Sequence, residues 1–463
     1  MSRFLHQLCA GIWVTMILLC HSPGYSQSSS QQHITQELYE IFDSEWEYAL
    51  KEYPENATFN GDKRFSDRLT DMSLAAIQQR QLHAREVLER LESINRQLLS
   101  RKDQLNYDLF KLHYEQSVKS QRFPSYLMAV SQLKGPQLDL PNLVRYTPFE
   151  NIEDYQAYMK RLQAIPRYIS QIISLLEEGI RQKWVMPREP LRGVAEQIRN
   201  QFELKVEESI FFEPFAKLPE NIDKSAQEQL VEKGKQIISS MVLPAFRKFY
   251  TFWTEVYYPA TYTEPGVWQL PNGEEYYQVQ INGFTTTNLT AQQIHEIGLQ
   301  EVKRIHQEME RLIDSLHFEG SYADFLNFLR TDPQFYYTRA EDLLIGYRDI
   351  CKRIDPELVK LFGKLPRTPY GVKEIPAYQA PTTYTAYYQP PAEDGSRAGY
   401  FYANTYKLNT RPKYEMEALA IHEAVPGHHL QIALARELEN VPKFRRSWGY
   451  TAFVEGWALY AES

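Results

Sequence analysis

Apolar residues recur at every third or fourth position along most of this chain, which is the period of an amphipathic α-helix. Ser73 and Thr290 stand just before two of these stretches. They are predicted N-caps, because their side chains can accept hydrogen bonds from the first helical turn. The periodicity predicts helices over residues 33–50, 73–99, 107–118, 154–183, 224–257, 290–316, 340–354, 414–440 and 448–463.

Some segments in the second half of the chain depart from this period and are rich in Pro, Tyr and Gly. Residues 276–284 follow an Asn-Gly turn signal, and we expect a strand there. Residues 384–388 and 399–406 are predicted as two further short strands, separated by an Asp-Gly turn. The expected fold is therefore mainly α, a large helical domain with a small β-sheet next to the helices of the candidate site described below.

Residues 1–26 have the pattern of a secretory signal peptide. Arg3 supplies a positive charge, residues 8–20 form an apolar run too short to cross a membrane, and small residues follow at the expected cleavage site. Lipid attachment at Cys20 is the alternative, although the residue before it is bulky. Residues 27–32 are predicted to be a Ser-rich linker. Because no later run is apolar over 18 residues, we expect an exported protein, periplasmic or secreted, without a transmembrane segment in its mature chain.

Composition indicates an ordinary globular protein. Hydrophobic residues make up 43% of the chain, which argues against broad disorder, and a net charge of −8 without a basic block argues against nucleic-acid binding. Residues 33–463 are predicted to form one large domain, with two candidate lobes at 33–260 and 261–463. Cys351 is the single cysteine beyond the signal peptide, so no internal disulfide is expected. The sequence makes no prediction of oligomeric state.

The candidate chemistry lies within the predicted helix over residues 414–440. His422, His428 and His429 lie within eight residues, and Glu423 directly follows the first histidine. Zinc hydrolases commonly carry two histidines four residues apart on one helical face, with a glutamate beside the first as general base. The combination therefore predicts a Zn²⁺ site with Glu423 as its catalytic base.

The spacing of the histidines departs from that signature. On a straight helix, His428 would lie about 9 Å along the axis from His422 and about 120° around it, and His429 about two turns away. Neither pair could then share an ion. Pro426 and Gly427 predict a kink or bulge that brings the chain back. The residues alone leave open which of the two later histidines is the second ligand, and whether the cluster is a chance grouping on a kinked helix.

A catalytic zinc keeps three protein ligands and one water. Glu455 interrupts an apolar, aromatic helix, so we expect its carboxylate to be buried and to need a partner. Zinc is one candidate partner, and a salt bridge to Arg445 or Arg446 is the other. Glu462 lies seven residues further along on the same helical face. It is a candidate either for a hydrogen bond to one of the ligand side chains, without contact to the metal, or for replacing Glu455 as a ligand.

Motifs in several parts of the chain match those of one bacterial family. Residues 422–431 and 453–462 carry the most specific match. The other motifs are Pro54-Glu55-Asn56-Ala57-Thr58 with Gly61-Asp62 and Asp67-Arg68-Leu69, Thr285-Thr286-Thr287 with Ile294-His295-Glu296-Ile297-Gly298, and Asp394-Gly395-Ser396-Arg397 with Asn404-Thr405. Over essentially its whole mature length, the chain resembles the family described as a domain of unknown function, number 885.

The resemblance implies an architecture similar to the mostly helical zinc peptidases, such as thimet oligopeptidase and carboxypeptidase Taq. In those enzymes a Gly-His pair closes the zinc motif and a Phe-Val-Glu context carries the last ligand, which favours His428 as second ligand and Glu455 as third. His429 is then expected beside the ligands or facing the substrate. Family members typically continue well beyond this motif, so the resemblance also implies a chain truncated at its C-terminus, with crippled catalysis.

Residues 399–406 are also a candidate edge strand along which a peptide substrate could lie. Arg397, Tyr402 and Asn404 are the candidate substrate contacts there, and ordinary turn or strand packing is the alternative for each. His295 is followed by a glutamate but lacks a second histidine four residues on, so we interpret this pair as structural helix residues.

These patterns favour a zinc-dependent hydrolase, with a metallopeptidase that cleaves peptides or small amides as the first candidate. Zn²⁺ would be held by His422, His428 and Glu455, and Glu423 would move the proton. Two alternatives stay open. One is a catalytically impaired peptidase-like protein that binds peptides or acts as a scaffold. The other is a zinc amidase or esterase with a non-peptide substrate.

Overall fold

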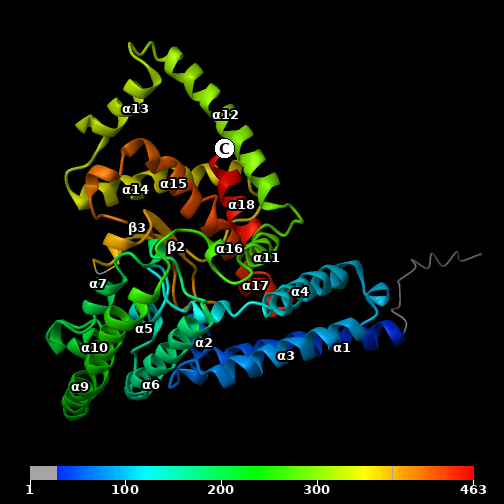
Figure 1. Ribbon diagram of the computed structural model, residues 1–463, viewed down its shortest axis with the longest axis vertical. Helices are drawn as coiled ribbons and strands as arrows, with labels where there is room; N and C mark the ends of the chain where they lie inside the picture. The colour runs from blue at the N-terminus through cyan, green and yellow to red at the C-terminus, as the bar shows by residue number, and fades with distance from the viewer. Residues whose placement is uncertain (1–28, 378) are drawn as a thin grey trace, which may run out of the picture.

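The computed structural model describes residues 29–377 and 379–463, and its fold is mainly helical with one small sheet (Figure 1). The predicted fold class is confirmed at that level. The predicted signal peptide, with Cys20, lies outside the described residues. Helix α1 (Ser29–Glu52) begins inside the segment predicted as a linker, because the glutamines there are good helix formers.

The other helices include one or more in every later segment predicted as helical, and further helices that were not predicted lie between them. They are α2 (Pro54–Phe59), α3 (Leu74–Ser93), α4 (Arg101–Ser120), α5 (Pro136–Tyr146), α6 (Ile152–Gln182), α7 (Val194–Arg199), α8 (Glu213–Ala216), α9 (Lys224–Ile237), α10 (Leu243–Phe252), α11 (Gly273–Thr285), α12 (Ala291–Ser315), α13 (Tyr322–Thr331), α14 (Ala340–Ile354), α15 (Met416–Glu423), α16 (His428–Arg436), α17 (Lys443–Ser447) and α18 (Thr451–Glu462). Among the described residues, no helix combines the length and apolarity needed to cross a membrane. A single domain over residues 33–463, divided near residue 260, stays a prediction.

Helices α1, α3 and α4 lie side by side (Figure 1) and share an apolar core. Ser73 caps α3, as predicted, by accepting a hydrogen bond from the Ala76 amide at 3.3 Å. Phe110 of α4 packs edge-on against Phe444 of α17, with ring centroids 4.8 Å apart. The segment that follows the histidine cluster is therefore anchored in the N-terminal helices.

Arg161 of α6 is buried and binds several groups of the motif at residues 54–69. Its side chain is 1% exposed. The guanidinium donates to the main-chain oxygens of Arg68 and Pro54 at 2.8 and 3.0 Å, and to the Thr58 hydroxyl at 2.7 Å. These residues belong to the motif that carries the family resemblance, so the motif has a structural role: it holds α2 and the following loop against α6.

Replacing Arg161 by methionine should lower the free energy of unfolding by about 3 kcal/mol, because buried carbonyl and hydroxyl oxygens lose their donor. The matched control is Lys160→Met at the neighbouring position, where the side chain is 64% exposed and pairs with Asp67 at the surface. Urea unfolding of both variants measures the difference. Equal losses in the two would contradict the role assigned to Arg161.

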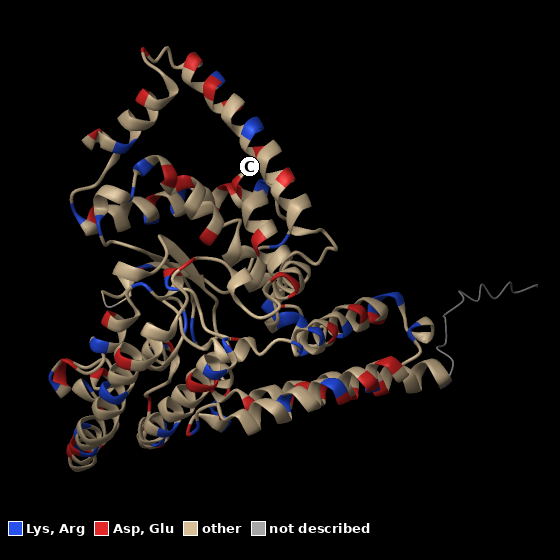
Figure 2. Ribbon diagram, in the orientation of Figure 1, with Lys and Arg blue, Asp and Glu red and all other residues tan. Residues whose placement is uncertain are grey.

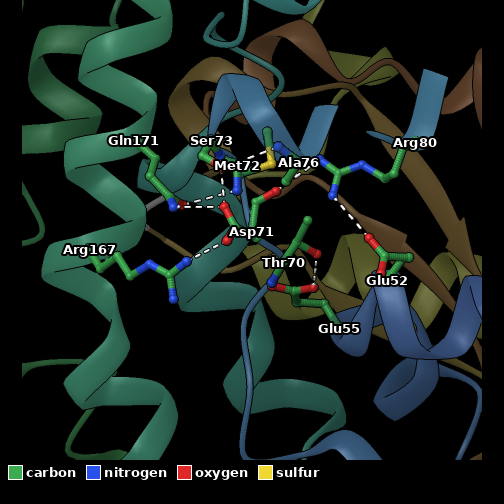
Figure 3. A network of polar contacts seen from close by, with 10 residues as sticks. All are labelled: Glu52, Glu55, Thr70, Asp71, Met72, Ser73, Ala76, Arg80, Arg167 and Gln171. Atoms are coloured by element: carbon green, nitrogen blue, oxygen red, sulfur yellow. Dashed lines mark hydrogen bonds and ion pairs between the residues drawn. The ribbon is translucent and has the colours of Figure 1, made fainter. Parts of the chain in front are cut away.

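A second polar network lies where α3 begins beside α6 (Figure 3). Asp71 accepts a hydrogen bond from the Gln171 side chain at 2.8 Å and forms an ion pair with Arg167. Beside it, the Glu55 carboxylate accepts from the amide and the hydroxyl of Thr70 at 2.8 and 2.5 Å. These bonds fix the loop between α2 and α3.

Residues 276–284, predicted as a strand, belong to helix α11 instead. Glu274 and Glu275 occupy its first turn, where the helix dipole stabilises carboxylates. Val279 and Ile281 are both buried and alternate along the sequence as in a strand. They lie on different sides of a helix that contacts both α4 and α18. Burial on two sides therefore produced the alternating pattern that is typical of a strand.

Helices α12 and α13 project from the rest of the chain (Figure 1). Thr290 caps α12 as predicted and shares a capping box with Gln293. Basic and acidic residues are interspersed along α12 (Figure 2), and Arg304 pairs there with two glutamates at 2.8 and 3.0 Å. His295 and Glu296 are exposed on this helix, and the metal-ligand grouping found among the described residues does not include them.

The sheet contains β1 (Tyr370–Glu374), β2 (Ala386–Gln389) and β3 (Gly399–Ala403), in the order β1-β3-β2. β3 pairs in parallel with β1 and antiparallel with β2. The two strands predicted in this region are confirmed, and β1 was not predicted. Because β3 is the middle strand, the expectation that residues 399–406 form an edge for substrate is wrong. β2 is an edge strand, and it contacts α15.

Candidate metal centre

The bend predicted between the histidines is present. Helix α15 ends at Glu423 and α16 begins at His428, with a cis Val425–Pro426 peptide bond between them. The Gly427 amide donates to a carbonyl of α15 at 2.9 Å, and a Cβ at Gly427 would come within 2.0 Å of another carbonyl oxygen of that helix. Only glycine fits where the chain turns back so closely, and this turn brings His428 beside His422.

His422, His428 and Glu455 form the grouping of potential metal ligands found among the described residues. The Nε2 atoms of the two histidines each lie 3.7 Å from Oε2 of Glu455. One ligand atom from each residue lies within 4.8 Å of the other two. Ligand atoms about 2.1 Å from a tetrahedral zinc ion are separated by about 3.4 Å. The donor set and its spacing therefore fit zinc after small side-chain movements.

Two hydrogen bonds fix helix α18, which carries Glu455, against this bend. The Trp457 indole donates from Nε1 to the Pro426 carbonyl at 2.8 Å. The Gln431 side chain of α16 donates to the Phe453 carbonyl at 3.1 Å. The three candidate ligands are therefore held together by contacts between their own helices.

Glu455 is half exposed, so the expectation of a buried carboxylate is wrong. Its side chain is 52% exposed, because α18 buries only a narrow face at Ala458. Arg445 bonds to an asparagine of α4, and Arg446 pairs with a glutamate in the loop before β3. The predicted alternative of a salt bridge to one of these arginines is therefore wrong as well, and the partners of Glu455 are the two ligand histidines.

Glu462 contacts Nδ1 of His422, the ring nitrogen that does not face Glu455. Its Oε1 atom lies 2.6 Å from Nδ1. A carboxylate in that position holds the proton on Nδ1 and leaves the Nε2 lone pair for a metal. The geometry favours Glu462 as support for a ligand over its alternative role as a replacement for Glu455.

Glu462→Gln should weaken zinc binding by about 10- to 100-fold, because the amide cannot stabilise the imidazole as a carboxylate does. Competition with a chromophoric chelator measures the affinity. Glu439→Gln, an exposed position beyond the end of α16, is the matched control. The same affinity in both variants would count against the supporting role of Glu462.

Glu423 is buried beside this grouping and is 6% exposed. Burial raises the pKa of its carboxyl to about 7, and the nearby carboxylate of Glu455 adds to the rise, although His422 opposes it. The main-chain amide of Tyr388 meets the same carboxylate and opposes the rise. A carboxyl with a pKa near neutrality can both accept and release a proton at neutral pH, which is what a general base requires.

His429 lies outside the ligand grouping. It is 1% exposed, and its Nδ1 lies 2.8 Å from the Tyr388 hydroxyl. Burial lowers the pKa of His429 to about 4, while a hydrogen bond to the main chain of Thr368 opposes the shift. Of the two histidines left open by the sequence, His428 is therefore the one whose imidazole meets the other ligands.

The predicted substrate contacts each have packing or hydrogen-bond partners of their own. Arg397 donates to the Phe59 carbonyl at 3.1 Å and lies over the Phe59 ring. Tyr402 stacks on Tyr387, with centroids 4.9 Å apart, on the sheet face opposite Tyr388. Asn404 is 1% exposed and donates to two main-chain carbonyls at 2.8 and 2.9 Å. These contacts favour the packing alternative for each residue.

Sequence reasoning missed two residues at this centre. Tyr388 acts through its main-chain amide, and because nearly every residue has such an amide, the residue type gives no signal for this role. Trp457 binds the carbonyl of a proline 31 positions earlier, and it stands in an apolar run where an aromatic residue is ordinary. The one signal was the proximity of Trp457 to Glu455 in the sequence, and that did not distinguish it from core packing.

Comparison with known proteins gives a family and a fold. A sequence model of a family described as a bacterial protein of unknown function, DUF885, matches residues 54–463. The chain is also similar to the crystal structure of the "putative lipoprotein" from Colwellia psychrerythraea, with a TM-score of 0.83 and 23% identity over 94% of this chain and 77% of that one. At that identity the likeness shows the fold alone. No curated protein matches the chain.

Proposed function

This chain belongs to the DUF885 family of bacterial proteins, and we propose that it is a zinc-dependent hydrolase that cleaves peptides. One observation carries the proposal: Nε2 of His422, Nε2 of His428 and Oε2 of Glu455 converge beside the buried carboxylate of Glu423. Two imidazoles and a carboxylate are a ligand set of catalytic zinc sites. The inferred relation to the helical zinc peptidases is part of this proposal.

In the proposed mechanism each residue has one task. A bound zinc ion would polarise the scissile carbonyl and lower the pKa of its water. His422, His428 and Glu455 would hold the metal, and Glu462 fixes the ring of His422 through Nδ1. The Glu423 carboxylate accepts the proton of the attacking water and then delivers it to the nitrogen of the leaving amine. The Tyr388 amide holds that carboxylate in place.

The edge of the sheet favours a peptide over other substrates. The Asn404 amide donates to the Thr385 carbonyl at 2.9 Å, which makes these two residues a hydrogen-bonded pair of the ladder. Because such pairs alternate in antiparallel sheets, the main-chain groups of Ala386 and Tyr388 point away from β3. The Tyr388 amide does so and meets Glu423. An extended peptide could add its main chain along this edge through groups other than the Tyr388 amide, next to the general base.

We also propose that the protein is exported. The support is the signal-peptide pattern of residues 1–26 and the description of the similar Colwellia protein as a "putative lipoprotein". Fractionation of cells that produce the full-length chain, with mass analysis of the mature N-terminus, distinguishes release after residue 26 from lipid attachment at Cys20. An uncleaved cytoplasmic product would contradict export.

Metal analysis and a substrate panel test the proposed activity. We expect one zinc ion per chain and cleavage of unstructured peptides that stops when a chelator removes the metal. Panels of peptides, simple amides and esters separate a peptidase from an amidase or esterase. Zinc binding with peptide affinity and no cleavage would favour the non-catalytic alternative, and protein free of bound metal would overturn the site assignment.

A further inference from the structure

His429 contacts all three strands of the sheet. Its Nδ1 lies 2.8 Å from the Tyr388 hydroxyl on β2, and its ring centroid lies 4.7 Å from that of Tyr370 on β1. On β3 the neighbour is Gly399, where a Cβ would come 2.4 Å from the Tyr388 hydroxyl and 3.0 Å from Nδ1 of His429. The imidazole and the phenol therefore meet only because residue 399 has no side chain.

The hydrogen bonds of His429 fix which atom donates to which. One ring nitrogen bonds to the main chain of Thr368, where a carbonyl oxygen is the group that accepts from a ring N–H. That leaves Nδ1 as an acceptor in the neutral ring. The Tyr388 hydroxyl must then donate to Nδ1, and the phenol is tied to one position above the sheet.

Tyr388 joins this pair to the general base. Its side chain is held by His429, while its amide points away from β3 and meets the Glu423 carboxylate. The two groups belong to one residue in an edge strand, which has a ladder partner on one side only. A shift of the phenol can therefore be passed to the amide.

We propose that His429 is a positioning residue: by accepting the Tyr388 hydroxyl, it holds the Tyr388 amide where it orients the Glu423 carboxylate. The proposal rests on the proposed function for its effect on turnover, but not for the geometry itself. It assigns a role to the histidine that adjoins ligand His428 without making it a metal ligand. It also explains why glycine occupies position 399.

Amide hydrogen exchange in metal-free protein tests the geometry without any reaction. Tyr388→Phe removes the donor, and Gly399→Ala displaces the pair by steric contact. Both should speed exchange of the residue 388 amide by about 10-fold, the worth of one hydrogen bond. His429→Asn keeps an acceptor near the position of Nδ1, so exchange of the residue 388 amide should stay as slow as in the wild type. Gly363→Ala, where nothing lies within 4 Å of the added carbon, is the control. Unchanged exchange in Tyr388→Phe and Gly399→Ala would overturn the proposal.

Kinetics of the zinc-loaded protein provide the second readout. We expect kcat to fall by about 10-fold in Tyr388→Phe and in Gly399→Ala, with KM and zinc content kept. The double variant should lose no more than the larger single loss, because both changes break the same bond. Additive losses, or loss of zinc in His429→Asn, would overturn the positioning role. If the two variants show faster exchange but the wild-type protein hydrolyses no peptide, the proposed function is contradicted and the positioning role stands.

Discussion

Glu423→Gln should lower kcat for peptide hydrolysis by about 10²- to 10⁴-fold, the usual contribution of a positioned general base, while one zinc ion per chain stays bound. The amide has the shape of the carboxylate and can still sit opposite the Tyr388 amide, but it cannot accept the proton of a water. Glu423 is not one of the three converging ligands, so its neutralisation leaves the metal donors intact. The measurement is steady-state hydrolysis of a fluorogenic peptide, with metal content determined on the same samples.

Glu417→Gln is the matched control, because Glu417 is exposed on the same helix, α15. It should leave kcat within about twofold of the wild type, as surface changes away from a site usually do. Full activity in Glu423→Gln would refute the assigned base, whatever the metal content. A loss of zinc together with activity would mean that Glu423 supports the metal and would leave the proton transfer unassigned.

The bend at the site could be predicted because its cause is local. Pro426 and Gly427 interrupt a helix by their own backbone chemistry, and the structure places the break between Glu423 and His428. The N-caps Ser73 and Thr290 were found for the same reason, since a cap acts on the turn directly after it.

The features that sequence reasoning missed depend on contacts between distant segments. Glu455 looked buried because its neighbours are apolar, yet α18 turns only Ala458 fully inward. Helix α11 looked like a strand because packing on two sides buries alternate residues. The pairing of β1 with β3, which makes β3 a middle strand, is set by tertiary packing that no local pattern records.

His428→Ala should abolish stoichiometric zinc binding. The loss of affinity should exceed the roughly 100-fold that follows removal of a residue that only hydrogen-bonds to a ligand. His422 and Glu455 would remain, and two protein ligands do not complete the set of three that catalytic zinc requires. Zinc at 100 times its dissociation constant should stabilise the wild type by about 2.7 kcal/mol, and this increment should vanish in the variant. Metal content after gel filtration and urea unfolding with and without zinc measure both effects without reference to hydrolysis.

Two further histidine variants make this result specific. His295→Ala changes an exposed imidazole on α12 and should keep both zinc and the zinc-dependent stabilisation. His429→Asn should keep them as well, because the His429 ring bonds to Tyr388 and lies outside the ligand grouping. Zinc retained in His428→Ala but lost in His429→Asn would transfer the second ligand to His429. Zinc retained in all three would refute the metal centre, because the bend at Gly427 would then bring two histidines together without binding an ion between them.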